Sequence, residues 1–153
     1  MTSLATSQIN VLRARGMIRS GILIVAAALA EVVIFQDSPL PAGLLGILAM
    51  IATVLLTFVL PGRRYRSWSY DVGEDELYVQ QGIWVRTRTI VPFGRVQHID
   101  VSQGPIERRY GVGVLTLHTA GTRSSAVYLP GLEMAQAEGM RDDIRGKIRQ
   151  DLA

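Results

Sequence analysis

The stretch VPFGRVQHIDVSQGPIERRYG, Val91–Gly111, decides how the polar half of this 153-residue chain folds. It begins with Pro92–Gly94, a combination that is typical of a break between strands. Val96–Gln103 then alternates apolar and polar side chains, as a half-buried strand does. Gly104–Gly111 opens with Gly-Pro and closes with glycine, which is typical of a short helical turn. The stretch therefore predicts a strand and a helical connector, and it concentrates a histidine, two acidic residues and three arginines in one short region.

The sequence on both sides of this stretch alternates in the same way, and turn residues separate the alternating runs. The further predicted strands are Arg66–Val72, Glu76–Gln81 and Ile83–Val91 before it, and Val112–Thr119 and Ser125–Pro130 after it, the last two joined by the turn Ala120–Ser124. Leu132–Leu152 is predicted to form a terminal helix with a single apolar stripe. The stripe comprises Ala137, Met140, Ile144 and Ile148. This set predicts an α+β fold, in which a bent antiparallel sheet or open barrel is closed by the C-terminal helix.

Residues 20–62 are almost free of charge, with only Glu31 and Asp37 ionisable. Two apolar runs, residues 17–35 and 40–60, would extend about 28 Å and about 31 Å as helices. Both lengths match the hydrocarbon core of a bilayer, about 30 Å. Gln36–Pro39 can only reverse the chain, and Pro61–Gly62 should end the second helix. The sequence therefore predicts a tail of residues 1–16, a transmembrane hairpin of residues 17–62 and a polar domain of residues 63–153.

Arginines flank both predicted spans, whereas the short connection contains no lysine or arginine. They are Arg13 and Arg15 before the first span with Arg19 at its start, and Arg63, Arg64 and Arg66 after the second span. The positive-inside rule then predicts that both termini are cytoplasmic. The second group, with Trp68, is expected to contact anionic lipids, each arginine contributing about 1 kcal/mol. A secretory signal peptide is the alternative for the first run, although that run continues beyond Ala28–Ala30, where cleavage would occur.

Glu31 is the one acidic residue inside the predicted spans, and Arg19 lies at the start of the first span. It could form a proton or ion site, contact a partner helix, or reach the headgroups near the outer surface. The last role is favoured because no second acidic group accompanies Glu31 in either span. The second span also carries a stripe of small side chains, which suits close packing against the first span or against another protein. The stripe comprises Ala42, Gly46, Ala49, Thr53 and Thr57.

His98 and Asp100, with His118 on a later strand, offer the one chemical hypothesis, a metal site or a His–Asp pair that orients a serine. The chain has only two histidines and no cysteine, and it contains no HExxH, GxSxG or glycine-rich phosphate motif. We therefore expect no catalytic, metal or cofactor site. The favoured alternative is a structural joint that comprises Arg95, His98, Asp100, Glu107, Arg108 and Arg109. On that interpretation, replacing His98 or Asp100 with alanine should lower the free energy of unfolding by about 1–3 kcal/mol.

The run P-x-x-R-V-Q-H-I-D-V-x-Q-G-P at Pro92–Pro105, with L-x-L-H-T-A-G at Leu115–Gly121, resembles the membrane-flanked bacterial pleckstrin-homology (PH) domain family, the YdbS-like proteins. The resemblance covers residues 65–148 and the preceding hairpin. It implies a PH-like barrel with a C-terminal capping helix on the cytoplasmic side of a bacterial plasma membrane. It implies no enzymatic activity.

These observations predict a non-catalytic, membrane-anchored binding module, an adaptor or accessory subunit of a membrane protein complex. Besides the lipid bilayer, the expected partner is another membrane protein or a second copy of the chain. A net charge of +3 without a basic face argues against nucleic acid. The candidate partner surface is Trp84, Arg86 and Arg88 on one face of the predicted strand, the alternative being that Trp84 packs under the terminal helix. The alternative function is an enzyme or transport component that uses Glu31 or the His98 and Asp100 cluster.

Overall fold

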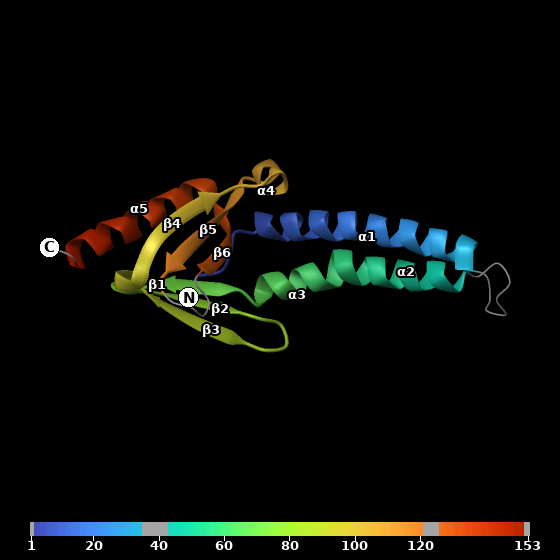
Figure 1. The fold of residues 1–153 in the computed structure, drawn as a ribbon, viewed down its shortest axis with the longest axis horizontal. Coiled ribbons are helices and arrows are strands. Elements are labelled where there is room, and N and C mark those ends of the chain that lie inside the picture. The colour runs from blue at the N-terminus through green and yellow to red at the C-terminus, as the bar shows by residue number, and fades with distance from the viewer. Residues whose placement is uncertain (1, 35–42, 121–125, 152–153) are drawn as a thin grey trace. The chain divides into compact units, whose positions relative to one another are not determined.

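The computed structural model describes residues 2–34, 43–120 and 126–151, which are drawn as ribbon in Figure 1. The chain divides into two compact units. The helical unit is Ile9–Arg63, and the β unit combines Met1–Gln8 with Arg64–Ala153. The predicted connection Gln36–Pro39 and most of the predicted turn Ala120–Ser124 lie outside the described residues.

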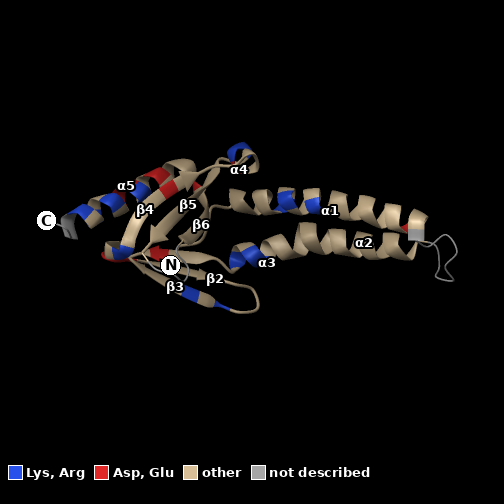
Figure 2. Cartoon of the chain, viewed as in Figure 1, with Lys and Arg blue, Asp and Glu red and all other residues tan. Residues whose placement is uncertain are grey.

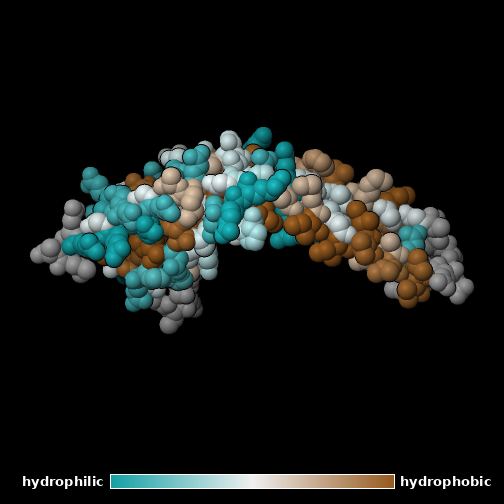
Figure 3. Space-filling model, turned by 90° about the horizontal axis from the view of Figure 1, so that it is seen from above, coloured by the Kyte–Doolittle hydropathy of each residue, from teal (hydrophilic) through white to brown (hydrophobic). Residues whose placement is uncertain are grey.

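Two long helical segments dominate the helical unit. The first is α1, Ser7–Ile34, and the second runs through α2 (Leu44–Val54), the π-helical turn η1 (Leu55–Val59) and α3 (Leu60–Arg66). Both segments are long and apolar enough to cross a membrane. Figure 2 shows no charged residue along α2, and Figure 3 shows hydrophobic side chains gathered over these helices. The predicted pair of apolar helices is thus confirmed.

The prediction that Pro61–Gly62 ends the second helix is wrong, because the helix continues to Arg66. A proline normally breaks an α-helix, since it has no N–H for the bond to the residue four positions earlier. Here η1 precedes the proline, and the Leu60 N–H bonds to the Leu55 carbonyl oxygen, five residues back. This wider turn changes the pattern of backbone hydrogen bonds just before Pro61, which is where the proline would otherwise interrupt the regular α-helical pattern.

Small side chains allow the two segments of the helical unit to approach closely. A Cβ atom on Gly16 of α1 would lie 2.5 Å from the Leu56 carbonyl oxygen, so only glycine fits there. One turn further on, Ser20 Oγ and Thr57 Oγ1 are 3.2 Å apart and share a buried hydrogen bond. Thr57 belongs to the predicted small-residue stripe, for which packing against the first span and packing against another protein were the two alternatives. Its contact with Ser20 agrees with the first of them.

The β unit consists of two three-stranded antiparallel sheets, ordered β1-β2-β3 and β4-β5-β6, and the C-terminal helix α5 (Figure 1). The elements are β1 Ser69–Val72, β2 Glu76–Gln81, β3 Thr87–Pro92, the 3-10 turn η2 Phe93–Arg95, β4 Val96–Ser102, α4 Pro105–Arg109, β5 Val112–Thr119, β6 Ala126–Glu133 and α5 Met134–Asp151. This arrangement confirms the predicted α+β class and its PH-like order of strands followed by a helix.

The core of the β unit is formed by side chains of both sheets and of α5. Phe93, Leu77 and Leu115 are among its fully buried members. The predicted stripe of α5 faces this core, with Ala137 and Ile144 fully buried and Met140 and Ile148 partly buried against it. Because burial of an aliphatic side chain contributes about 1.5–3 kcal/mol, packing stabilises a helix whose two glycines weaken its intrinsic propensity.

The opening stretch of the sequence adopts the predicted local structure. In β4, Ile99 and Val101 are partly buried against the core, whereas His98 and Asp100 are exposed on the other face. α4 follows, and the backbone at Gly111 has a φ of 68°, the left-handed region that favours glycine at a helix end.

The first residues of the chain belong to the β unit and are not a separate tail. Thr2 pairs with Tyr70 of β1 through two backbone bonds of 2.6 Å and 3.0 Å. Leu4 is 4% exposed and lies in the core, and the Ala5 N–H donates to the Gly131 carbonyl at 2.8 Å. Residues 2–5 thus complete the β unit that residues 64–151 begin.

Candidate functional site

The loop between β2 and β3 carries most of the predicted partner surface. The strand predicted from Ile83 begins only at Thr87, so Trp84 and Arg86 lie in a loop and Arg88 alone is on a strand. The cause is Gly82. Its φ of 117° is a backbone conformation that glycine adopts readily and other residues rarely do, and a Cβ atom at this position would lie 1.8 Å from the Val85 carbonyl oxygen. The chain therefore turns tightly at Gly82 and leaves the sheet.

This tip loop, Gly82–Arg86, presents apolar side chains to the surroundings. Trp84 is 85% exposed and Val85 is 77% exposed. The alternative in which Trp84 packs under the terminal helix is therefore wrong. Arg86 and Arg88 are exposed beside it, and the Arg88 Nε–H donates to Gln80 Oε1 at 3.2 Å. Aromatic and arginine side chains exposed together are typical anchors of interfaces.

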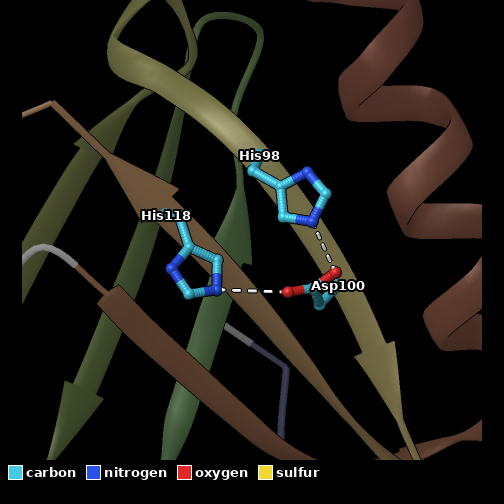
Figure 4. Close-up of polar contacts among 3 residues, drawn as sticks. All are labelled: His98, Asp100 and His118. Atoms are coloured by element: carbon cyan, nitrogen blue, oxygen red, sulfur yellow. Dashed lines mark ion pairs between the residues drawn. The ribbon is translucent and has the colours of Figure 1, made fainter.

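His98, Asp100 and His118 form a cluster on one face of the second sheet (Figure 4). His98 of β4 and His118 of β5 are cross-strand partners, and their rings are 5.8 Å apart. His98 Nε2 lies 2.7 Å from one carboxylate oxygen of Asp100, and His118 Nε2 lies 3.2 Å from the other. The antiparallel register thus brings both histidines to the same carboxylate.

The stability cost predicted for the structural joint assumes a buried polar partner, whereas the side chains of the cluster are in contact with solvent. His98, Asp100 and His118 are 69%, 49% and 41% exposed. Of the other predicted members of the joint, Glu107 is buried in α4, whereas Arg95, Arg108 and Arg109 are exposed. Across the residues that the structure describes, no group of three His, Cys, Asp or Glu side chains is arranged to hold a metal ion.

Glu31 lies near the end of α1, and its side chain reaches the start of the second helical segment. Its carboxylate accepts a hydrogen bond from the N–H of Gly43, the residue that caps α2. A carboxylate at a helix N-terminus is favourable because the helix dipole is positive there. Glu31 also borders an apolar hollow of about 340 Å³ between α1 and α2. The geometry gives Glu31 a structural partner that the sequence interpretation did not consider.

The predicted lipid-contact residues separate into two groups. Arg63, Arg64 and Arg66 are exposed on α3. Trp68 is half-buried and packs against the core of the β unit, so it is not a free side chain for the membrane interface. It lies next to Tyr65, whose hydroxyl donates to the Leu4 carbonyl oxygen at 2.8 Å. Packing inside the β unit therefore determines the position of Trp68.

A groove of about 440 Å³ between β4 and α5 has no counterpart in the sequence interpretation. One wall carries Arg141, Arg145 and Arg149, spaced four residues apart. Arg141 donates to Asp142 at 2.9 Å, and this bond raises the pKa of Arg141 and lowers that of Asp142. The spacing was visible in the sequence, but the strand opposite this row of arginines depends on the tertiary structure.

A family model described as the bacterial PH domain matches residues 18–148. The transmembrane protein YdbS of Bacillus subtilis (strain 168) is 41% identical over 103 residues, which cover 67% of this chain and 63% of that protein. The chain thus matches less than two thirds of the length of this relative. No solved structure matches the chain.

Proposed function

Because the chain belongs to the bacterial PH domain family, we propose that it is a non-catalytic binding module of the bacterial plasma membrane, an adaptor or accessory subunit of a membrane protein complex. The family match and the apolar helices make it a membrane-associated PH-like protein. The binding role goes further and is supported by one observation, the exposed tip loop.

In this proposal both helical segments cross the membrane and both termini are cytoplasmic. Leu4 precedes the two helical segments and Ile144 follows them, yet both belong to one core. This shared core favours a topology in which the residues before and after the spans lie on the same side of the membrane. Arginines beside the spans favour the cytoplasm as that side, where Arg63, Arg64 and Arg66 would meet anionic lipids. A reporter active only outside the cytoplasm should be silent after Ala153 and active at Ser38. The reverse pattern would contradict the topology.

The tip loop supports the binding role because its composition differs from that of an ordinary polar turn. Ile83, Trp84 and Val85 follow one another, and all three are exposed. Burying such side chains in an interface would contribute about 25 cal/mol of favourable free energy for each Å² of apolar surface removed from water. With Arg86 and Arg88 alongside, the loop has the composition of a contact with another membrane protein.

Site-specific photo-crosslinking in native membranes tests this role. A photoreactive amino acid at position 84 should yield a discrete adduct with another membrane protein. The same group at Tyr128, which is exposed on β6, serves as the matched control and should not yield that adduct. Adducts at position 84 only with lipid would contradict the adaptor role, and adducts only with the chain itself would replace it with homo-oligomer formation.

A further inference from the structure

The groove between β4 and α5 follows the edge of a strand. Four consecutive residues of β4, Val96–Ile99, line it. Because successive side chains of a strand point to opposite faces, four residues in a row can border one groove only along the strand's edge. In the described sheet order, β4 is an end strand that pairs with β5 on one side. An edge of this kind is a template for a further strand.

The opposite wall of the groove is basic. Arg141, Arg145 and Arg149 follow one another at intervals of four positions, so they form one row on α5. The groove lining contains no carboxylate. Arg141 is paired with Asp142, whereas Arg145 and Arg149 have no ion pair with any side chain that the structure describes. Two exposed guanidinium groups are thus positioned beside the strand edge outside any ion pair with a described side chain, and only Arg145 has a carboxylate, Asp142, near enough to lower that carboxylate's pKa.

Apolar side chains from both elements also line the groove. Val96 and Ile99 contribute from β4, and Ile148 contributes from α5 between the arginines. The groove therefore combines main-chain hydrogen-bonding groups along β4, positive charge on α5 and apolar side chains from both elements. An extended peptide matches all three, because its backbone, acidic side chains and apolar side chains can be used at once.

We propose that this groove binds an extended peptide segment rich in aspartate and glutamate, which adds to β4 as a strand and pairs its carboxylates with Arg145 and Arg149. The inference rests on the proposed function and names the chemistry of the partner. Guanidinium groups bind carboxylates through paired, charge-assisted hydrogen bonds. A lipid headgroup would use the arginines but would leave the strand edge unpaired.

Fluorescence anisotropy with the full-length protein in mild detergent tests the proposal. The probe is a labelled peptide as long as β4, 7 residues, in which glutamate and valine alternate. Charge reversal by Arg145→Glu with Arg149→Glu should weaken its binding about tenfold or more. Both positions are exposed, so the variant should keep its fold, which circular dichroism checks. A peptide with glutamine in place of glutamate should lose affinity for the wild type to a similar degree.

Two controls separate this site from general attraction between opposite charges. Arg108→Glu with Arg109→Glu makes the same charge change on α4, outside the groove, and should bind the acidic probe like the wild type. A probe methylated on alternate backbone nitrogens keeps its charge but cannot pair as a strand, and it should bind about tenfold or more weakly.

Equal losses of affinity for the acidic probe in the α4 and α5 variants would overturn the proposed site. Binding of the methylated probe as tight as that of the unmethylated probe would overturn it too. Binding that survives Arg145→Glu with Arg149→Glu would do the same. The photo-crosslink from position 84 does not involve the groove. If that adduct persists while the groove variants bind the probe normally, the groove proposal fails and the proposed function stands.

Discussion

Tyr70 of β1 combines deep burial with a hydroxyl group that can ionise. It is 3% exposed, and its oxygen accepts a hydrogen bond from Gln136 Nε2 at 2.9 Å. Burial raises the pKa of Tyr70 above its ordinary value of 10.0, an effect that the hydrogen bond partly offsets. The folded β unit therefore favours the neutral tyrosine.

This pKa shift predicts that stability decreases at alkaline pH. Above about pH 10 the unfolded chain loses the Tyr70 proton first, so it binds fewer protons than the folded chain and the free energy of unfolding falls. Below that pH the contribution is fully present. Denaturant unfolding between about pH 8 and about pH 11 should show a steeper decline for the wild type than for Tyr70→Phe. The exposed Tyr128→Phe should behave like the wild type, and equal slopes for all three would contradict the assignment.

The histidine–aspartate cluster should contribute little to stability, in contrast to the expectation from sequence. Exposed ion pairs are worth about 0–1 kcal/mol, so Asp100→Ala should lower the free energy of unfolding by about 1 kcal/mol at most. Leu117→Ala, a change at a fully buried residue beside His118, should cost about 2–5 kcal/mol. Denaturant unfolding of both variants is the measurement. A cost for Asp100→Ala as large as that for Leu117→Ala would restore the buried-joint interpretation.

Glycines have opposite consequences in two neighbouring elements, β6 and α5. Gly131 of β6 has a φ of 74°, and a Cβ atom there would lie 2.6 Å from Gln8 Cγ. The Gln8 side chain is buried at this position. Gly139 of α5 is exposed, and a Cβ atom there would have no neighbour within 4 Å. Gly113 pairs with Leu132 and Val114 with Pro130, so Gly131 is the extra residue of a β-bulge. This bulge requires glycine, whereas the helix merely tolerates it.

Alanine substitutions should therefore change stability in opposite directions. Gly131→Ala should lower the free energy of unfolding by about 1–2 kcal/mol for the left-handed backbone alone, with the contact against Gln8 adding to the loss. Gly139→Ala should raise it by up to about 1 kcal/mol, because alanine has the higher helix propensity. Thermal or denaturant unfolding in detergent measures both. A stabilising Gly131→Ala would show that residues 2–8 do not pack on β6 in this way.

At the scale of the whole molecule, the two ends of the chain meet in one core. Leu4 belongs to the same cluster of buried residues as Tyr70, Leu129 and Ile144. Backbone bonds on either side of Leu4, at Thr2 and Ala5, fix its position. Folding of the β unit therefore requires residues on both sides of the apolar helices in the sequence.

Leu4→Ala should destabilise the β unit by about 2–5 kcal/mol, because it removes a core side chain and leaves a cavity. Ser3→Ala changes an exposed neighbour and should stay within about 0.5 kcal/mol of the wild type. Limited proteolysis combined with denaturant unfolding measures the difference. Equal stability of the two variants would mean that the N-terminal segment is dispensable for the fold.

The sequence by itself determined the features that depend on a short, regular pattern. Two long, largely apolar runs predicted the two apolar helices. The α5 stripe of Ala137 and Ile144 predicted which side of the helix is buried, because the 3.6-residue period of a helix is visible in one segment. Alternation in Val96–Ser102 likewise separated the core-facing Ile99 from the exposed His98.

Only the tertiary structure decided the features that depend on distant residues. Ile83–Arg86 alternates like a strand, yet the backbone turn at Gly82 takes it out of the sheet. Leu4 has no periodic pattern around it, and its burial follows from contacts with residues more than sixty positions away, such as Tyr65. The groove requires β4 and α5 to lie side by side. In each case the free energy comes from long-range packing and backbone pairing, which local propensity does not encode.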